Sequence, residues 1–344
     1  MNVNLPWTEV KGENSDIVLA TRVRLARNIA DRLMPQKLDA EQGGQVLNQC
    51  LGVLNKCDSP KFTCCKMAEL HPLERGVMVE KHLVSPAFMN PSDYALAAVS
   101  EDEKTCVMIN EEDHIRIQCL LPGLQIEAAW QEASRIDDML AKDITYAFDA
   151  QLGYLTACPT NLGTGLRASL MVHLPALTLT GRHKAIFANL ARMGMTVRGM
   201  YGEGSEASGN LYQISNQVTL GISEQDIIEN MHNVTLQIVE AEREARKALL
   251  QKSEIDFQDN VWRAYAVLAH SRRINIGEMM EKLSYLRLGI DMGMIEGITP
   301  HQLTQLMIKG QTAYIQKAAD KPLNEIGIEC ARADMLRQEL PLLK

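Results

Sequence analysis

The pattern of apolar residues changes at about residue 222, and this change limits the folds available to the chain. Between about Asp16 and Leu220, short apolar runs alternate with amphipathic stretches and with turns rich in Gly, Pro and Asn. This pattern predicts an α+β region with a mainly antiparallel sheet flanked by helices. The expected strands include Thr105–Ile109, Ile115–Leu120, Tyr154–Cys158 and Leu211–Leu220.

Helical periodicity governs the rest of the chain. Ser223 and Asp226 have the spacing of a helix N-cap, and a charged helical segment follows them to about Lys252. Its apolar positions recur at helical intervals, at Ile227, Met231, Val234 and Ile238. Residues 253–344 hold four or five further helical stretches, separated by Gly and Pro. With 344 residues at roughly 150 per domain, we predict an α+β domain over residues 1–252 and an all-helical domain over 253–344.

Composition excludes several classes of protein. The 43 Asp and Glu residues outnumber the 35 Lys and Arg residues, which argues against a nonspecific binder of nucleic acid or of anionic membranes. The N-terminus has no positively charged segment followed by an apolar one, and no apolar run approaches 18 residues, so we expect a cytoplasmic protein without a membrane span. The eight cysteines include no C-x-x-C pair, which indicates neither a zinc site nor a disulfide framework.

One long stretch of this acidic chain contains no acidic residue. From Ala150 to Gly202, 53 residues include no Asp or Glu, while Arg and Lys give a formal charge of +5. The five cations are Arg167, Arg182, Lys184, Arg192 and Arg198. A stretch of this kind can hold a polyanion, although surface charge also partitions unevenly by chance or faces an acidic subunit.

A second basic element lies near the N-terminus, where Arg22 and Arg24 alternate with Val23 and Leu25. On a strand, this alternation places both guanidinium groups on one face and the apolar residues in the core. Two like charges on a short strand repel each other, so a partner anion is expected. Phosphate fits, because a guanidinium donates bidentate hydrogen bonds and keeps its charge.

Three successive acids, Glu111, Glu112 and Asp113, stand between two expected strands. They predict either a solvated turn or a cation-binding or general-base cluster at a sheet edge, with Arg116 as a further phosphate contact. The next acid after the acid-free stretch is Glu203, in a glycine-rich segment that predicts a mobile loop able to bring a carboxylate to a substrate.

The sequence lacks two common nucleotide-binding motifs. Gly163 to Ala168 matches the G-x-G-x-x-G/A fingerprint, but the acid that should follow about 20 residues later is missing. The sequence also has no G-x-x-x-x-G-K-[ST] loop. Nucleotide phosphates would therefore be held by arginine side chains. Nearby, Cys158 lies at an expected strand end among basic residues that favour a thiolate, although most free cysteines are buried and inert.

Together these segments resemble the signature motifs of the phosphagen (ATP:guanido) kinases, which include creatine and arginine kinase. The resemblance covers about Asp16 to Lys252 and rests on four motifs: Ala20-Thr-Arg-Val-Arg24, Asn110-Glu-Glu-Asp-His-Ile-Arg116, Cys158-Pro-Thr-Asn-Leu-Gly-Thr164 and Arg198-Gly-Met-Tyr-Gly-Glu203. Those enzymes have a helical domain before the first motif, whereas here a helical domain follows. This layout resembles the bacterial protein-arginine kinases over essentially the whole chain, as do Val79-Glu-Lys-His-Leu83, Gly202-Glu-Gly-Ser-Glu-Ala207 and Arg287-Leu-Gly-Ile-Asp291.

The resemblance implies a phosphagen-kinase-like catalytic domain that uses ATP and Mg²⁺, with the ion held mainly by phosphates and water. Glu112 and Glu203 would orient the acceptor guanidinium, one of them as general base, with Cys158 beside it. The phosphates would be cradled by Arg22, Arg24, Arg116, Arg167 and Arg198, with His82 near the nucleotide. The other implied nucleotide contacts are Ala20, Thr21, Val23, Ala168, Ser169, Leu170, Met171, Gly199, Met200, Tyr201, Gly202 and Glu203 itself.

The implied activity is transfer of the γ-phosphoryl group of ATP to arginine side chains of proteins, marking them for Clp-type proteolysis. The implied partners are protein substrates with exposed arginine, an activator protein, the Clp protease system and a second copy in a homodimer. Two alternatives stay open: a kinase for a small free guanidino compound, and a noncatalytic adaptor.

The sequence departs from the bacterial kinases at two places. Gly76 stands where they usually have arginine, next to Arg75. Their C-terminal R-D-x-x-R-A element, which receives phosphoarginine, is here Ile328-Glu-Cys-Ala-Arg-Ala333. This replacement favours an ordinary helix face over an allosteric phosphoarginine site.

Overall fold

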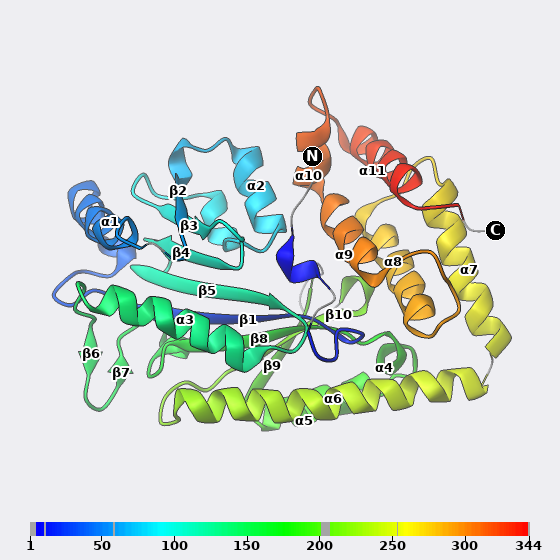
Figure 1. Cartoon of the computed structure of the whole chain (residues 1–344), viewed down its shortest axis with the longest axis horizontal. Coiled ribbons are helices and arrows are strands. Elements are labelled where there is room, and N and C mark those ends of the chain that lie inside the picture. The colour runs from blue at the N-terminus through cyan, green and yellow to red at the C-terminus, as the bar shows by residue number, and fades with distance from the viewer. Residues whose placement is uncertain (1–4, 10–11, 58, 201–206, 253, 343–344) are drawn as a thin grey trace.

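The computed structural model describes residues 5–9, 12–57, 59–200, 207–252 and 254–342 (Figure 1). Its centre is an eight-stranded sheet in the order β2-β3-β4-β5-β1-β8-β10-β9, in which every pair of neighbours is antiparallel. The strands are β1 Val18–Arg27, β2 Phe62–Lys66, β3 Leu96–Ser100, β4 Thr105–Ile109, β5 Ile115–Pro122, β8 Leu166–His173, β9 Met195–Gly199 and β10 Leu211–Asn216. A separate hairpin pairs β6 Phe148–Asp149 with β7 Gly153–Tyr154.

Helices surround the sheet and form the C-terminal region. Those within or near the sheet are α1 Ala40–Leu54, α2 Pro72–Glu80, α3 Ile126–Ala141, α4 Pro175–Leu179, α5 His183–Arg192 and α6 Glu224–Lys252. The C-terminal helices are α7 Glu254–His270, α8 Ile276–Asp291, α9 Pro300–Lys309, α10 Thr312–Ala318 and α11 Glu325–Glu339. This arrangement confirms the predicted α+β architecture followed by a helical region.

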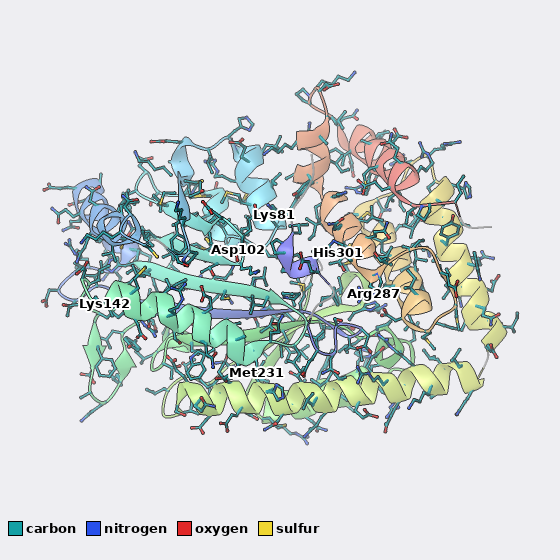
Figure 2. All side chains as sticks on the ribbon, viewed as in Figure 1. Lys81, Asp102, Lys142, Met231, Arg287 and His301 are labelled. Atoms are coloured by element: carbon teal, nitrogen blue, oxygen red, sulfur yellow. The ribbon has the colours of Figure 1, made fainter. Side chains whose placement is uncertain are left out.

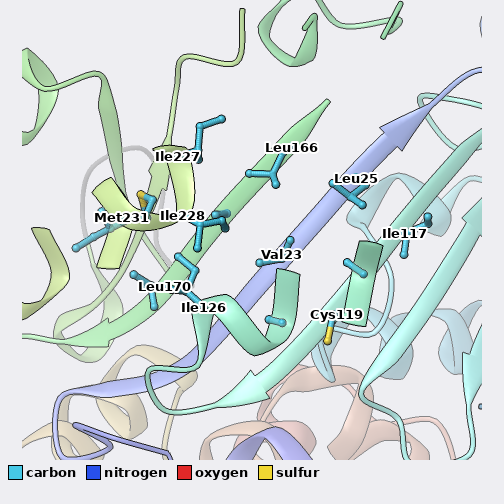
Figure 3. Packing of buried hydrophobic residues seen from close by; sticks show 14 of the residues in the cluster. Val23, Leu25, Ile117, Cys119, Ile126, Leu166, Leu170, Ile227, Ile228 and Met231 are labelled. Atoms are coloured by element: carbon cyan, nitrogen blue, oxygen red, sulfur yellow. The ribbon is translucent and has the colours of Figure 1, made fainter. Parts of the chain in front are cut away.

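The main hydrophobic core lies on one face of the sheet, beneath α1, α3, α5 and α6 (Figure 3). Val23 and Leu25 of β1 are fully buried there, and Ile227 and Met231 of α6 pack against the same face. Burying each such side chain contributes roughly 1.5–3 kcal/mol. Because strand residues alternate, this burial directs Arg22 and Arg24 to the opposite face.

Two smaller cores flank the opposite face. One packs α2 and the 3₁₀ turn η4 Pro86–Met89 onto β3 and β4, with Phe88 and Met108 at its centre. The other packs the C-terminal helices onto Ala20, Leu120 and Met171 of the sheet. Between these two cores lies a polar strip of the sheet, which includes Arg22 and Arg24 of β1 and Arg167 of β8.

The N-terminal 3₁₀ turn η1, Pro6–Thr8, bridges the two flanks (Figure 2). Trp7 Nε1 donates to the carbonyl of Lys81, just after α2, at 3.2 Å. On the other side, the ring nitrogen Nδ1 of His301 in α9 lies 2.8 Å from the carbonyl of Thr8. The two flanking cores are thus joined through one buried indole and its neighbours.

Several local predictions can be compared with the structure. Strand β4 has the predicted bounds, and α6 begins with the predicted cap, since Asp226 N donates to Ser223 Oγ at 3.1 Å. The expected strand Tyr154–Cys158 is wrong: only Gly153–Tyr154 is strand. Beyond it, the backbone N–H of Ala157 binds the Asp113 carboxylate at 2.7 Å rather than a neighbouring strand. The strand expected over Leu211–Leu220 ends at Asn216.

The helical region has five helices, within the predicted number, but it shares a hydrophobic core with the sheet. Its junction also contains buried ion pairs: Arg287 of α8 binds Asp291 at 3.1 Å, and Arg246 of α6 lies 3.6 Å from the same carboxylate. The domain boundary at residue 252 stays a prediction. Among the residues described here, no helix has the length and apolar composition needed to cross a membrane.

Candidate active site

Strand register gathers arginines from four strands on the polar strip. Arg24 of β1 lies directly opposite Arg167 of β8, and on its other side opposite Gln118 of β5. Directly opposed residues of antiparallel strands point to the same face. Arg116 of β5 lies opposite Ala26, two positions along β1 from Arg24, and therefore shares this face.

The same face extends to the far edge of the sheet. Arg22 lies opposite Ser169 of β8. Gln213 of β10 lies between Met171 of β8 and Arg198 of β9, so Arg198 also points to the polar strip. The five arginines that the sequence singles out thus share one face.

The charges of the Arg24 and Arg167 guanidinium groups are not fully neutralised by the side chains around them. Burial, and then the charges of Arg22, Arg116 and Arg167, hold the pKa of Arg24 well below its usual value. Burial and then Arg198 lower the pKa of Arg167. The Nε atoms of both residues are buried without a hydrogen-bond partner. Unsatisfied donors on repelling cations favour an anion with several oxygens.

Neutral side chains orient the array without neutralising it. Arg22 donates through Nη2 to Gln213 Oε1 at 2.6 Å and through Nε to Ser169 Oγ at 3.5 Å. Arg167 donates through Nη2 to Ser215 Oγ at 3.1 Å. Gln213 and Ser215 were not among the predicted site residues, although their alternation along β10 indicates that they share a face.

Arg116 has a different environment from Arg24. Its guanidinium lies 2.5 Å from Glu111 and 2.5 Å from Glu112, and 3.7 Å from Asp113. Burial alone would lower the pKa of Arg116, but the three carboxylates outweigh it and raise that pKa. The predicted phosphate contact of Arg116 therefore stays a prediction, and in this structure the residue orients the acidic turn.

The two glutamates of this turn differ in accessibility. The Glu111 side chain is 3 % exposed and also accepts from Ser85 Oγ at 2.5 Å and from the backbone N–H of Glu112 at 2.9 Å. The Glu112 side chain is 41 % exposed. Glu111 is therefore occupied in holding the turn, whereas Glu112 can reach a substrate. The turn is not the solvated one that the sequence also allowed.

Asp113 and His114 anchor the turn from beneath. Asp113 is fully buried and accepts from Asn28 Nδ2 and from Ala157 N, both at 2.7 Å, which fixes the acidic turn against the segment leading to Cys158. Burial raises the pKa of Asp113. His114 Nδ1 accepts from the backbone N–H of Ile29 at 3.0 Å, and burial lowers the pKa of His114 to about 4.

Cys158 joins this constellation. Its side chain is partly buried, and Sγ lies 3.0 Å from Thr160 Oγ1. Cys158 and Glu112 both lie close enough to Arg167 to affect its pKa, so the thiol, the exposed carboxylate and the arginine array share one neighbourhood. The predicted thiolate state stays a prediction.

His82 lies at the α2 side of the array. Its carbonyl accepts from Gln118 Nε2 at 2.8 Å, and its ring meets the Trp7 indole edge to face with centroids 5.5 Å apart. Burial, and then the charge of Arg22, lower the pKa of His82 to about 3, so the ring is neutral. The structure thus places a neutral imidazole beside the arginines.

Most side chains of the remaining predicted nucleotide contacts do not face the polar strip. The side chains of Val23, Ala168 and Leu170 belong to the main core on the other face, and those of Ala20, Met171 and Met200 to the core under the C-terminal helices. Thr21 Oγ1 donates to the Gly123 carbonyl at 2.6 Å. Ser169 and Gly199 lie on β8 and β9. Tyr201, Gly202 and Glu203 lie outside the described residues, and contacts by all these positions stay predictions.

The acid-free stretch divides between the two faces of the sheet. Arg167 and Arg198 face the polar strip, whereas Arg182, Lys184 and Arg192 lie at α5, which packs on the main core. Arg182 lies 4.0 Å from Glu244 of α6. The stretch therefore does not act as one polyanion surface.

The first departure from the bacterial pattern, Gly76, has a structural explanation, and the arginine retained in the second element, Arg332, is buried. A Cβ at Gly76 would lie 2.9 Å from the Cβ of Ala313, so α2 and α10 approach too closely there for a side chain. Arg75 does not take over an exposed role, because its Nη1 donates to two backbone carbonyls at 3.1 Å. Buried Arg332 similarly donates to the carbonyls of Gly310 and Ile274, at 2.7 and 3.0 Å.

Comparisons with known proteins agree with this geometry. The model of the ATP:guanido phosphotransferase C-terminal catalytic domain matches residues 45–245, and that of the protein-arginine kinase McsB C-terminal domain matches residues 254–344. The chain is 46 % identical over 344 residues to the protein-arginine kinase of Bacillus cereus (strain B4264), covering 98 % of this chain and 96 % of the other. It is 45 % identical over 339 residues to the protein-arginine kinase of Bacillus subtilis (strain 168), covering 98 % and 93 %.

Solved structures share the fold. A lombricine kinase aligns with a TM-score of 0.61 at 23 % identity, covering 67 % of this chain and 68 % of that one. The duplicated taurocyamine kinase from Schistosoma mansoni, with bound transition state analogue components, aligns with a TM-score of 0.61 at 27 % identity, covering 68 % of this chain and 34 % of that one. The chain therefore belongs to the ATP:guanido phosphotransferase family, and to the branch of it whose curated members are named protein-arginine kinases.

Proposed function

We propose that this protein is a protein-arginine kinase, which transfers the γ-phosphoryl group of ATP to arginine side chains of proteins. The single observation that supports this most is the position of a partly exposed carboxylate, Glu112, beside an array of arginines on one sheet face. The positively charged array is complementary to a polyphosphate, and the carboxylate is complementary to a guanidinium. Each of the two substrates of a guanidino kinase therefore has a group of opposite charge in the site.

The phosphates of ATP would be held by Arg22, Arg24, Arg167 and Arg198, with Arg116 in a supporting position. The buried, unpartnered Nε atoms of Arg24 and Arg167 fit an anion of this kind. Mg²⁺ would be held mainly by the phosphates and water, and it would neutralise part of their charge. Positive charge arranged before the reaction stabilises the transferring group at no reorganisation cost.

The acceptor needs a carboxylate because a protonated guanidinium is a poor nucleophile with a pKa above 12. In the reaction, an N–P bond forms, the bond from the γ-phosphorus to the bridging oxygen breaks, and ADP leaves. One guanidinium proton passes to a carboxylate, for which Glu112 and Glu203 are our candidates. Glu111 and Arg116 act as positioning residues by fixing the turn that carries Glu112.

The finer parts of the proposal rest on the family resemblance. They are an activator protein, marking of substrates for the Clp protease system, a homodimer, a cytoplasmic location, and a division into a catalytic domain (1–252) and a helical domain (253–344) for protein binding or dimerisation. Cys158 is proposed to lie beside the bound guanidinium.

The test is an assay with Mg-ATP, an arginine-rich unfolded protein and free L-arginine, read by mass spectrometry under conditions that preserve the acid-labile N–P bond. We expect phosphate on protein arginine and a loss of about 10²–10⁴-fold in rate for Glu112→Gln. Glu127→Gln, the same change at an exposed residue of α3, is the matched control and should keep full activity.

Each outcome of this assay is informative. Glu203→Gln should behave like Glu112→Gln. Phosphate mainly on free arginine would instead assign a small guanidino compound as substrate. Full activity in both glutamate variants would refute the assignment of the acceptor site.

A further inference from the structure

Helix α8 of the C-terminal region packs closely against the 3₁₀ turn η6, Ser208–Asn210, which directly precedes β10. This turn lies between the glycine-rich segment that contains Glu203 and the start of β10. Asn210 Nδ2 donates to Ser284 Oγ of α8 at 2.8 Å. The turn that precedes β10 is therefore attached to a helix of the C-terminal region.

Ser284 is buried and contacts two side chains of the sheet region. It is 4 % exposed, and besides Asn210 it contacts Nε2 of His173, the last residue of β8, at 2.8 Å. Burial, followed by the charges of two arginines, holds the pKa of His173 well below its usual value, so the ring is neutral. One hydroxyl can then accept from Asn210 and donate to an unprotonated ring nitrogen.

Backbone contact reinforces the side-chain contact. Gly209 has φ of +63°, and a Cβ built on it would lie 2.6 Å from the Met280 carbonyl oxygen of α8. Only glycine permits this approach. The cavity lined by Gly209, Ser284, His173 and Arg287 measures about 10 Å³, which is too small for a ligand. The interface is close-packed and is built to hold η6 in place.

Hydrogen bonds and strand β10 connect Asn210 to the arginine array. The Asn210 carbonyl accepts from Leu174 N at 3.0 Å, and β10 begins at the next residue. Two residues further along β10, Gln213 accepts from Arg22 at 2.6 Å. Met200, just after β9, donates its N–H to the carbonyl of Leu211 at 2.8 Å. A shift of η6 would therefore move β10, the end of β9 and the partner of Arg22.

Helix α8 is itself fixed to the sheet side of the molecule. Arg287, one turn after Ser284, donates to the Ser15 carbonyl at 2.8 Å and to Asp291 at 3.1 Å. Asp291 also lies 3.6 Å from Arg246 of α6. The helix is thus a rigid support, not a loosely docked element.

We propose that Ser284 is a positioning residue for phosphoryl transfer: through Asn210 it fixes β10 relative to the arginine array. The helical C-terminal region thereby completes the catalytic geometry of the sheet. This inference rests on the proposed function, because its kinetic consequence requires arginine phosphorylation.

The test compares Ser284→Ala and Ser284→Thr with the wild-type protein and with Glu281→Ala, an exposed control on the same helix. Rates are measured well below the melting temperature, per folded molecule. We expect kcat to fall about tenfold to a hundredfold in Ser284→Ala, since displacement of catalytic groups by about 1 Å has effects of this size. Ser284→Thr, which keeps the hydroxyl, should recover most of the loss, and Glu281→Ala should match wild type.

A merely structural role would lower the melting temperature and leave kcat per folded molecule unchanged, and that result would overturn the inference. Hydrogen exchange gives a second readout that does not depend on activity: the Leu174 and Met200 amides should exchange faster in Ser284→Ala than in Glu281→Ala. Equal exchange would also overturn it. Should Ser284→Ala fail to fold, Ser284→Cys keeps nearly the same volume and weakens both hydrogen bonds.

The two proposals fail in different ways. If the wild-type protein phosphorylates arginine and Ser284→Ala does so equally well, only the positioning role is refuted. If the wild-type protein phosphorylates no arginine, the proposed function and the kinetic role of Ser284 both fail, whatever the exchange experiment shows about anchoring.

Discussion

Replacement of Arg24 by glutamine should stabilise the nucleotide-free protein while weakening its response to ATP. Arg24 lies directly opposite Arg167, and its buried Nε has no partner. Like charges directly opposed on neighbouring strands cost roughly 0.2–1 kcal/mol per pair, and Arg22 and Arg116 add to this repulsion. After allowance for the lost packing of the arginine stem, Arg24→Gln should raise the free energy of unfolding by about 1 kcal/mol.

The same substitution should weaken ATP binding, and with it the stabilisation of the folded protein by ATP. At a nucleotide concentration of 100 times Kd, binding stabilises the folded state by about 2.7 kcal/mol. Loss of one preorganised charged contact costs about 2.7–4 kcal/mol, which weakens Kd about a hundredfold or more. At the same concentration, the stabilisation of Arg24→Gln by Mg-ATP should therefore fall to about 0.4 kcal/mol.

Thermal and urea unfolding, each with and without Mg-ATP, measure both quantities. Arg182→Gln is the matched control: it removes a cation from the same acid-free stretch, but one that lies at α5 on the other side of the sheet. It should leave the ATP response intact. Two results would contradict this prediction: an Arg24→Gln variant about 1 kcal/mol less stable than wild type without nucleotide, or one that keeps the full ATP-induced stabilisation.

Three further predictions concern stability. His114 keeps a pKa of about 4 in the folded state against about 6.5 in the unfolded chain, so its stabilising contribution is complete above pH 6.5 and is lost as the pH falls. Between pH 7 and pH 5, protonation of His114 should account for about 2 kcal/mol of lost stability. The unfolding free energy of His114→Asn, measured with urea, should therefore depend less on pH than that of wild type. An equal pH dependence in the two proteins would contradict the low pKa of His114. Gly209→Ala should cost about 1–3 kcal/mol more than Gly221→Ala in urea unfolding, because both glycines have positive φ but only Gly209 faces a close backbone atom. Glu80→Ala should lower the unfolding free energy by about 1–2 kcal/mol, since the Glu80 carboxylate accepts from two backbone N–H groups at the start of α10; an unchanged urea midpoint would refute this.

The sequence predicts which residues of a strand face the site better than it predicts which residues meet there. The alternation of Arg22 and Arg24 with Val23 and Leu25 was sufficient to place both arginines on one face. That Arg24 meets Arg167, 143 positions later, depends on the register of β1 with β8, which no local pattern specifies. Gln213 could not be predicted as the partner of Arg22 for the same reason, because their contact depends on how the strands pair.

Errors arose where tertiary contacts overrode local preference. Residues 155–158 have strand-like composition, but the N–H of Ala157 is bound by the buried carboxylate of Asp113, so no strand continues there. The acid-free stretch has uniform charge in the sequence, yet it crosses the sheet and divides between two faces. Charge counts along the chain carry no information about such a division.

Several buried arginines of this protein have a carboxylate partner, and the contrast with Arg24 and Arg167 supports a ligand site at the polar strip. Arg27 lies 2.7 Å from Asp137 and 3.6 Å from the centre of the Tyr154 ring, and Arg287 binds Asp291. Buried Arg332 instead donates to two backbone carbonyls. Within the described part of the chain, Arg24 and Arg167 make no ion pair, and their Nε atoms are unpartnered. Holding these two mutually repelling cations without a carboxylate partner in the described residues costs stability. That cost is accounted for if a polyphosphate supplies the missing charge during the catalytic cycle.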